Sequence, residues 1–245
     1  MNRCNTSLLG LVLAAALLPA SADARNNELD HRARRAAEVF RELRVAPDSE
    51  IPEDLIARSR CIAVVPSLVK AAWFVGGHYG KGVLSCRSER ADWSPPVHVM
   101  LTGGGFGLQF GASSTDVVLF FMTERSVRSL LSSKIKLSGD AGVAAGPVGR
   151  STSASTDIAM NAEIYSYARS RGLFVGVSIE GGYLGVDGDD TRAFYGRNYR
   201  AQTILFEEEV TSIPRSAWEF LGALPQGGGG GGSGAGSDMQ EEPRF

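Results

Sequence analysis

The sequence predicts an α+β fold in a single domain, with a mainly antiparallel, curved, glycine-rich β-sheet and a few helices packed on it. Short apolar runs with β-branched or aromatic residues recur along the chain and are punctuated by glycine, as in Val97–Thr102 and Leu173–Glu180. Long helical patterns do not separate these runs, which argues against a doubly wound parallel sheet. The hydrophobic fraction of 43% is enough to bury a core.

Residues 1–24 predict a secretory signal peptide. A basic start at Arg3 precedes an apolar run over Leu8–Leu18, and small residues suited to signal peptidase follow. We expect cleavage after Ala22 or Ala24 and a periplasmic or secreted protein peripheral to a membrane. A retained membrane anchor is the alternative, although the apolar run is short for a bilayer span.

Residues 25–50 predict an N-terminal amphipathic helix, most clearly over Glu28–Arg44. Its narrow apolar stripe consists of Leu29, Ala33, Ala36, Ala37, Phe40 and Leu43. The basic residues expected to face a membrane include Arg34, Arg35 and Arg41. Such a helix could lie on an anionic membrane. The alternative is a helix packed on the fold, because acidic residues dilute its positive face.

Residues 51–225 predict the folded domain. Its expected strands are Ile62–Val65, Tyr79–Ser85, Val97–Thr102, Val117–Met122, Ala159–Ala168, Leu173–Glu180 and Gly182–Val186. Short helices are expected around Leu55, around Leu130 and over Pro214–Leu224. Ile204–Glu208 is expected to extend the sheet or to form a connector. The Gly/Ser-rich residues 226–245 predict a disordered tail.

Two cysteines, Cys61 and Cys86, remain after removal of the signal peptide, and each flanks a predicted strand. An oxidising compartment would permit a disulfide between them. Two buried free thiols are the alternative, and counting thiols in the denatured protein would decide between the two.

Composition and motif spacing argue against several function classes. The net charge of −2 provides no basic field for nucleic acid. Gly76–Gly82 lacks the phosphate-loop spacing, and no helix pattern follows Gly105–Gly111, so no nucleotide is expected. The three histidines are scattered, without a serine-nucleophile elbow or a zinc-ligand pair, so we expect neither an enzyme nor a cofactor or metal. Asp187–Asp190 predicts a solvated turn.

Ordered motifs between about Ile51 and Gly196 resemble the SYLF domain family. They are Ile62–Pro66, Gly76–Gly82, Gly103–Gly111, Lys134–Arg150, Glu163–Tyr167, Gly172–Gly176, Glu180–Gly181 and Phe194–Gly196. The resemblance implies a domain that binds anionic lipids and, in fungal and animal members, regulates cortical actin. We expect a bacterial envelope member, for which actin is an unlikely partner because export separates the two. Thr191 departs from the asparagine that the family often has there.

The predicted lipid- or anion-binding residues are Lys81, Lys134, Lys136 and Arg150. Each lies in a family-like motif beside small residues, whose backbone N–H groups can hold an anion while the side chain supplies charge. Trp73 and Phe74 are predicted to lie at a membrane interface. The alternatives are ion pairs of the basic residues with acids inside the fold, and a core position for the two aromatic residues.

The expected function is therefore non-catalytic binding of anionic phospholipid or of a membrane surface. One alternative is an envelope scaffold that binds a protein partner through its glycine-rich surface and tail. The other is an unrecognised hydrolase, which would need a cleft that joins His78 or His98 to a serine and an acid.

Overall fold

The computed structural model describes residues 18–45, 51–72, 76–88, 92–105, 111–132, 134–137, 142–147, 162–170, 173–177, 179, 181–207, 210 and 212–226. The helices are α1 (Leu18–Val45), α2 (Glu53–Arg58), α3 (Glu124–Ser132), α5 (Gly188–Tyr195), α6 (Ala201–Phe206) and α7 (Arg215–Leu221). The strands are β1 (Cys61–Ala72), β2 (Gly76–Cys86), β3 (Val97–Gly105), β4 (Gly111–Phe121), β5 (Ile135–Leu137), β6 (Val143–Ala145), β7 (Ile164–Ser170), β8 (Leu173–Gly176) and β9 (Gly182–Val186).

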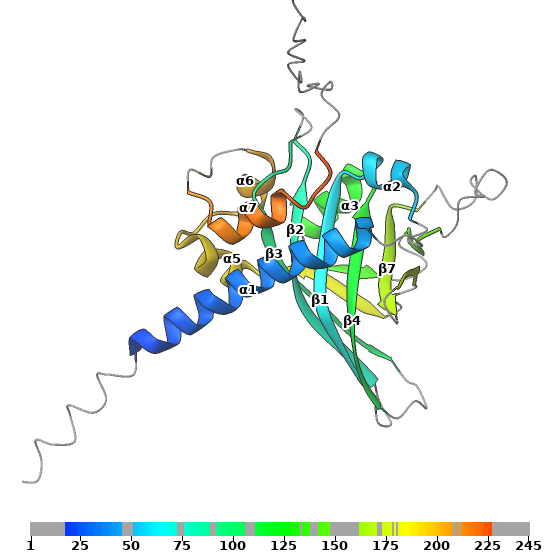
Figure 1. The fold of residues 1–245 in the computed structure, drawn as a ribbon, viewed down its shortest axis with the longest axis horizontal. Helices are drawn as coiled ribbons and strands as arrows, with labels where there is room; N and C mark the ends of the chain where they lie inside the picture. Colours follow the sequence, from blue (N-terminus) through cyan, green and yellow to red (C-terminus); the bar gives the residue numbers. More distant parts are fainter. Residues whose placement is uncertain are drawn as a thin grey trace, which may run out of the picture.

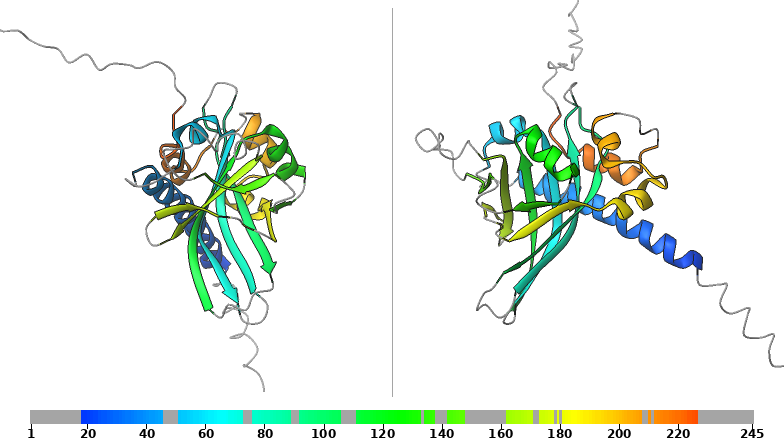
Figure 2. Two further views of the ribbon diagram at one scale, coloured as in Figure 1. Left: turned by 90° about the vertical axis from the view of Figure 1, so that its right-hand side faces the viewer. Right: turned by 180° about the vertical axis from the view of Figure 1, so that it is seen from behind.

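The strands form one curved sheet, which confirms the predicted α+β fold. Its order is β5-β9-β3-β2-β1-β4-β7-β6, and β8 pairs with β7. Among the described strands every pairing is antiparallel except that of β6 with β7. Figure 1 shows α1 crossing the sheet. Figure 2 shows from two further sides that the halves of β1–β4 that lie away from α2 and α3 extend beyond the helices.

A bulge in β1 bends the centre of the sheet. The register of β1 shifts between Val64 and Val69, and Ser67 within this interval has a φ of 54°. The Ser67 backbone N–H donates to Asp116 Oδ1 at 2.9 Å, so a side chain replaces the interrupted ladder bond. On β2, a Cβ placed on Gly82 would lie 2.1 Å from the Val64 carbonyl oxygen. The bend therefore requires glycine at position 82.

Helix α1 packs its apolar stripe against the rest of the fold. The predicted stripe residues are all fully buried, namely Leu29, Ala33, Ala36, Ala37, Phe40 and Leu43. They join the same core as the sheet and α7. The packed-helix alternative is thus the observed one. Because α1 begins at Leu18, both predicted cleavage positions lie within it, and cleavage stays a prediction.

Several predicted boundaries and elements need correction. Strand β1 continues to Ala72 beyond the expected stop at Pro66, because the bulge absorbs the interruption. Strand β8 ends at Gly176, short of the predicted Glu180. The segment expected to extend the sheet or form a connector is the helix α6, which buries Ile204 and Leu205.

The predicted solvated turn at Asp187–Asp190 is wrong. The Asp187 side chain accepts the N–H of Asp190 at 3.0 Å and so caps helix α5, which ends at the left-handed Gly196. Asp190 is only 4% exposed. Cations from distant parts of the chain surround this carboxylate, and residue spacing carries no signal for them.

Candidate lipid-binding surface

Lys81, on β2, belongs to a charged cluster that joins three elements. Its Nζ lies 2.8 Å from a carboxylate oxygen of Asp187 and 2.8 Å from Asp190 Oδ2. Arg32 and Arg25 of α1 also pair with Asp190, at 2.7 and 2.9 Å. Burial lowers the pKa of Lys81, but hydrogen bonds to the two carboxylates outweigh it and raise the pKa above its usual value. Lys81 therefore connects β2 to α5, and Asp190 connects both to α1.

His98 lies beside this cluster and is fully buried. Its Nδ1 is 3.3 Å from a guanidinium nitrogen of Arg32, and its ring packs edge-on against Phe194. Burial, aided by the positive charge of Arg32, lowers the pKa of His98 to about 3. His98 is thus neutral at physiological pH and has a packing role.

An exposed row of side chains runs across five adjacent strands. The row, named here the tyrosine face, consists of Lys136 (β5), Tyr183 (β9), Thr102 (β3), Tyr79 (β2) and Val69 (β1), which pair with one another in that order. Directly paired residues point to the same side of an antiparallel sheet. Val69, Tyr79 and Tyr183 are 48%, 50% and 43% exposed. Five strands at about 4.8 Å spacing give this row a length of roughly 19 Å.

Lys134 extends the tyrosine face by a second row. A Cβ placed on Gly185 of β9 would lie 2.8 Å from Lys134 Cγ, so the lysine stem crosses over this glycine. Gly185 lies two residues from Tyr183, on the same side of the sheet. The structure therefore brings Lys134 and Lys136 together on the exposed side of the sheet edge. Lys81 lies on the same side, but its ammonium group is paired with the carboxylates of Asp187 and Asp190.

Sequence reasoning missed the three exposed residues Val69, Tyr79 and Tyr183. A signal for Tyr79 was present, because Gly80 and Gly82 occupy the buried positions of β2. Small residues at alternate positions mark the closely packed side of a strand, so the residues between them point outward.

The remaining predicted site residues lie elsewhere. Arg34 is exposed on α1. Arg35 pairs with Glu38 at 3.0 Å and with Asp116 at 3.4 Å. Arg41 donates to the backbone carbonyl of Glu219.

Three predicted site residues, Arg150, Trp73 and Phe74, lie outside the described residues. Trp73 and Phe74 follow Ala72, which pairs with Gly76 at the end of the β1–β2 ladder. Their assignment to a membrane interface stays a prediction.

Cys61 and Cys86 face each other on β1 and β2 and are joined by a disulfide. The bridge ties the beginning of β1 to the end of β2, the part of the sheet farthest from the β1–β2 connection.

Comparison with known proteins identifies the family. The family model described as Ysc84, Las17-binding protein actin regulator, matches residues 102–226. SH3 domain-containing YSC84-like protein 1 of Xenopus laevis is 35% identical over 189 residues, which cover 74% of this chain and 56% of that protein. Its Homo sapiens counterpart is 33% identical over 186 residues, covering 74% and 54%.

A fungal relative shows a similar level of identity over a smaller share of its length. LAS seventeen-binding protein 3 of Saccharomyces cerevisiae (strain ATCC 204508 / S288c) is 35% identical over 161 residues, covering 64% of this chain and 35% of that protein. The chain thus spans about half the length of the animal relatives and about a third of the yeast protein. These matches confirm the resemblance found in the sequence motifs, and the chain belongs to the Ysc84, or SYLF, domain family.

Proposed function

We propose that this protein is a non-catalytic binding protein for anionic phospholipid surfaces, and that the tyrosine face with Lys134 and Lys136 makes the contact. The observation that carries the proposal is the row of two tyrosines, a valine, a threonine and a lysine across five strands, in which Val69, Tyr79 and Tyr183 are exposed. Tyrosine suits a membrane interface because its ring is apolar while its hydroxyl stays hydrated.

The two lysines supply the charge preference. Each basic side chain near an anionic bilayer contributes on the order of 1 kcal/mol, an effect that salt screens within a Debye length. Removing both lysines is therefore expected to weaken binding by about thirty-fold. Trp73 and Phe74, which follow β1 directly in the chain, are the proposed additional interfacial residues.

The contact proposed here is peripheral. Within the part of the chain that the structure describes, no helix combines the length and the apolarity needed to cross a bilayer. The apolar stripe of α1 is buried in the core, so the proposed contact uses the sheet and leaves α1 packed.

Co-sedimentation with vesicles tests the proposal. The wild-type protein is expected to bind phosphatidylglycerol-containing vesicles at low salt, to bind less at high salt, and to ignore phosphatidylcholine vesicles. Binding should fall in Lys134→Gln/Lys136→Gln and in Tyr79→Ser/Tyr183→Ser.

The matched control is Arg197→Gln/Arg215→Gln, which removes two exposed cations elsewhere and should bind as the wild type does. Equal binding by all three variants would refute the tyrosine face as the contact. Failure to bind any vesicle would refute lipid binding and favour a protein partner in the envelope.

We further propose that the protein acts in the periplasm or outside a bacterial cell. The basic start, the apolar run and the small residues up to Ala24 support this location. N-terminal sequencing of protein from a periplasmic fraction should begin at Asp23 or Arg25. Recovery of the full chain from the cytoplasm would contradict the proposal. The actin regulation named in the description of the family, and the Las17 binding named there and for the yeast relative, form no part of this proposal.

A further inference from the structure

The last residues that the structure describes are tied to the body of the fold. Trp93 Nε1 donates to the Pro225 carbonyl at 2.7 Å, and the side-chain amide of Gln226 donates to the Leu224 carbonyl at 3.4 Å. The Arg87 guanidinium stacks 4.5 Å from the centre of the same Trp93 ring. The chain that follows Gln226 therefore starts one indole ring away from Arg87.

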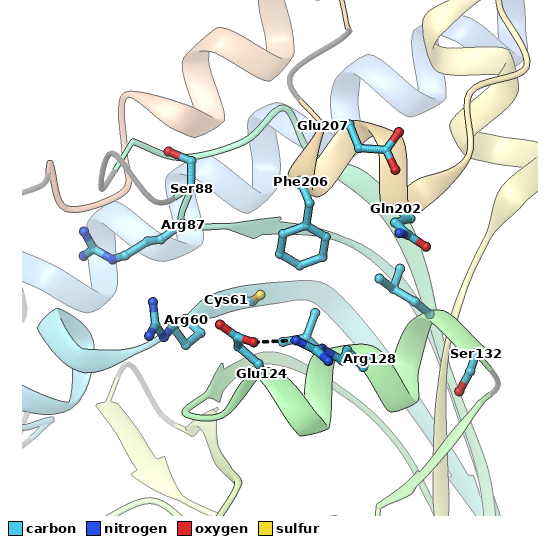
Figure 3. Close-up of a pocket in the computed structure, with 12 residues that line it drawn as sticks. Arg60, Cys61, Arg87, Ser88, Glu124, Arg128, Ser132, Gln202, Phe206 and Glu207 are labelled. Carbon is cyan, nitrogen blue, oxygen red and sulfur yellow. Dashed lines mark hydrogen bonds and ion pairs between the residues drawn. The ribbon is translucent and has the colours of Figure 1, made fainter.

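Arg87 lines a groove of about 810 Å³ between α3 and α6, named here the α3–α6 groove (Figure 3). Lining residues come from both ends of α3, so the groove follows this helix for about 13 Å. Its residue on β1 is Cys61, eight positions from Val69, so about 25 Å of strand separates it from the tyrosine face. The lining residues used below are Arg60, Arg87, Glu124, Arg128, Leu131 and Phe206.

The α3–α6 groove combines apolar surface with a basic character. Phe206 points from α6 into the groove and is 45% exposed, which is unusual for a phenylalanine (Figure 3). The lining contains three arginines and two glutamates, a formal charge of +1. Arg128 pairs with Glu124 at 2.8 Å, but both side chains are exposed. Such a pair contributes little, so another carboxylate can compete for Arg128.

The composition of the chain changes at Ser237. Residues 227–236 contain only glycine, serine and alanine. Residues 237–245, SDMQEEPRF, contain no glycine, and they carry three acids, one arginine and the large apolar residues Met239 and Phe245. Their formal charge of −2 is opposite in sign to that of the groove. A glycine tract that joins a fold to a segment of different composition is typical of a tether.

The tether is long enough to bring residues 237–245 to the α3–α6 groove. A glycine-rich chain of eleven residues has a root-mean-square end-to-end distance of roughly 18 Å, which exceeds the length of the groove. A segment tethered in this way has an effective concentration on the order of millimolar. A contact that is weak for a free peptide is therefore largely formed within one chain.

We propose that residues 237–245 bind in the α3–α6 groove of the same chain. Their carboxylates lie beside Arg60 and Arg128, and their two large apolar side chains pack on Phe206 and Leu131. The bound segment fills the groove, so another ligand enters only after the segment leaves. The proposal does not rest on lipid binding, because the groove shares no residue with the tyrosine face.

Paramagnetic relaxation enhancement in the full chain tests this contact. A nitroxide on Gln240→Cys lies at the centre of the segment. In a Cys4→Ser background it labels a single thiol, since Cys61 and Cys86 are joined by a disulfide. The label is expected to broaden the backbone amide signals of Ser132 and Gln202, which lie at the end of the groove opposite Arg87 (Figure 3). The amide signal of Tyr79 should stay sharp.

Two changes in the segment itself separate binding from simple tethering. Met239→Ser/Phe245→Ser removes the apolar contacts and should lower the ratio of bound to free segment by at least about ten-fold. The broadening of Ser132 and Gln202 should then largely disappear, although the tether is unchanged. Ala235→Ser, within the tether, is the matched control and should leave the broadening as it is.

A charge exchange tests the basic side of the contact. Arg60→Glu should lower the ratio of bound to free segment by up to about five-fold. Glu241→Lys/Glu242→Lys, combined with Arg60→Glu, should restore the broadening. Arg197→Glu reverses an exposed charge outside the groove and should change nothing. Thermal melts establish that the variants of Arg60 and Arg197 are folded.

A mixed sample identifies the chain to which the segment binds. It contains isotope-labelled protein without nitroxide and nitroxide-labelled protein without the isotope. Sharp signals of Ser132 and Gln202 in this mixture, with broad signals in the singly labelled chain, would support binding within one chain. Broad signals in the mixture would show binding to a second copy and overturn the proposal. Equal broadening with and without Met239→Ser/Phe245→Ser would also overturn it, whatever the vesicle result.

Discussion

Asp190 is the residue on which the charges of three elements converge. Its carboxylate receives Lys81 from β2 and Arg25 and Arg32 from α1, while Asp187 caps the helix that carries it. Burial raises the pKa of Asp190, but the hydrogen bonds from Lys81, Arg32 and Arg25 prevail and hold it well below the usual range. The carboxylate is therefore ionised whenever the protein is folded near neutral pH.

Asp190→Asn is expected to lower the free energy of unfolding by about 3 kcal/mol. The substitution leaves Arg32, whose side chain is only 9% exposed, without its buried counter-charge. Urea denaturation followed by circular dichroism measures the change. The neighbouring Asp189→Asn removes an exposed partner of Arg192 and should change stability by less than about 1 kcal/mol. Equal effects of the two substitutions would contradict the role of Asp190.

At the scale of elements, glycine spacing decides how closely the paired strands β1 and β2 approach each other at the bulge. Gly82 lies against the Val64 backbone, and Gly80 lies against the side chains of Val65 and Leu68. Alternate glycines allow one side of β2 to approach β1 closely, while Tyr79 and Lys81 point to the other side. The same pattern thus shapes the sheet and presents the tyrosine face.

Gly82→Ala is expected to destabilise the protein by about 3 kcal/mol, because the added methyl group would overlap the Val64 carbonyl and force the strands apart. Gly104→Ala, on β3, is the control. Its nearest neighbour would be the Gly76 carbonyl oxygen at 3.7 Å, an ordinary contact. Thermal unfolding should give a clearly lower melting temperature for Gly82→Ala than for Gly104→Ala. Similar melting temperatures would show that the β1 backbone can shift to accommodate the added methyl group.

At the scale of the whole molecule, α1 packs on the sheet and completes the hydrophobic core. Its stripe, β1 and α7 share one buried cluster, and Arg32 connects α1 to Asp190 and His98. A change in the charge of Arg32, Asp190 or His98 is therefore expected to change the free energy of unfolding of the whole protein.

Stability is expected to fall as the pH is lowered from 6.5 to 4.5. Burial and Arg32 depress the pKa of His98 from 6.5 to about 3 in the folded state. Between these two pH values, His98 is therefore protonated in the unfolded chain and neutral in the folded protein. The stabilising contribution is fully present above pH 6.5 and is lost toward pH 3, with a slope of at most about 1.4 kcal/mol per pH unit. The charges around His98 that set this balance are Arg32, Asp190, Asp187 and Lys81.

Urea midpoints across this pH window measure the slope. His98→Gln should flatten it, whereas substitution of the exposed His31 by glutamine should leave it unchanged. A slope identical in the wild type and His98→Gln would show that His98 titrates alike in both states.

The fold class, the stripe of α1 and the family could be predicted from the sequence by itself, because periodicity and glycine spacing are local properties of the chain. The two lysines at the sheet edge could be singled out in the same way, since each lies beside small residues within a recognisable motif. Alternation predicts which side of a strand is packed, and spacing predicts which side of a helix is apolar.

Only the tertiary structure decided which basic residues are paired with which acids. Lys81 resembles Lys134 in sequence context, but its carboxylate partners, Asp187 and Asp190, lie more than a hundred residues away in the chain, at the start of α5. A groove likewise joins the start of β1, the end of β2, α3 and α6, with Cys61, Arg87, Leu131 and Phe206 among its lining residues. Ion pairs and cavities depend on distances between side chains brought together by strand register and helix packing, and no local pattern of residues encodes those distances.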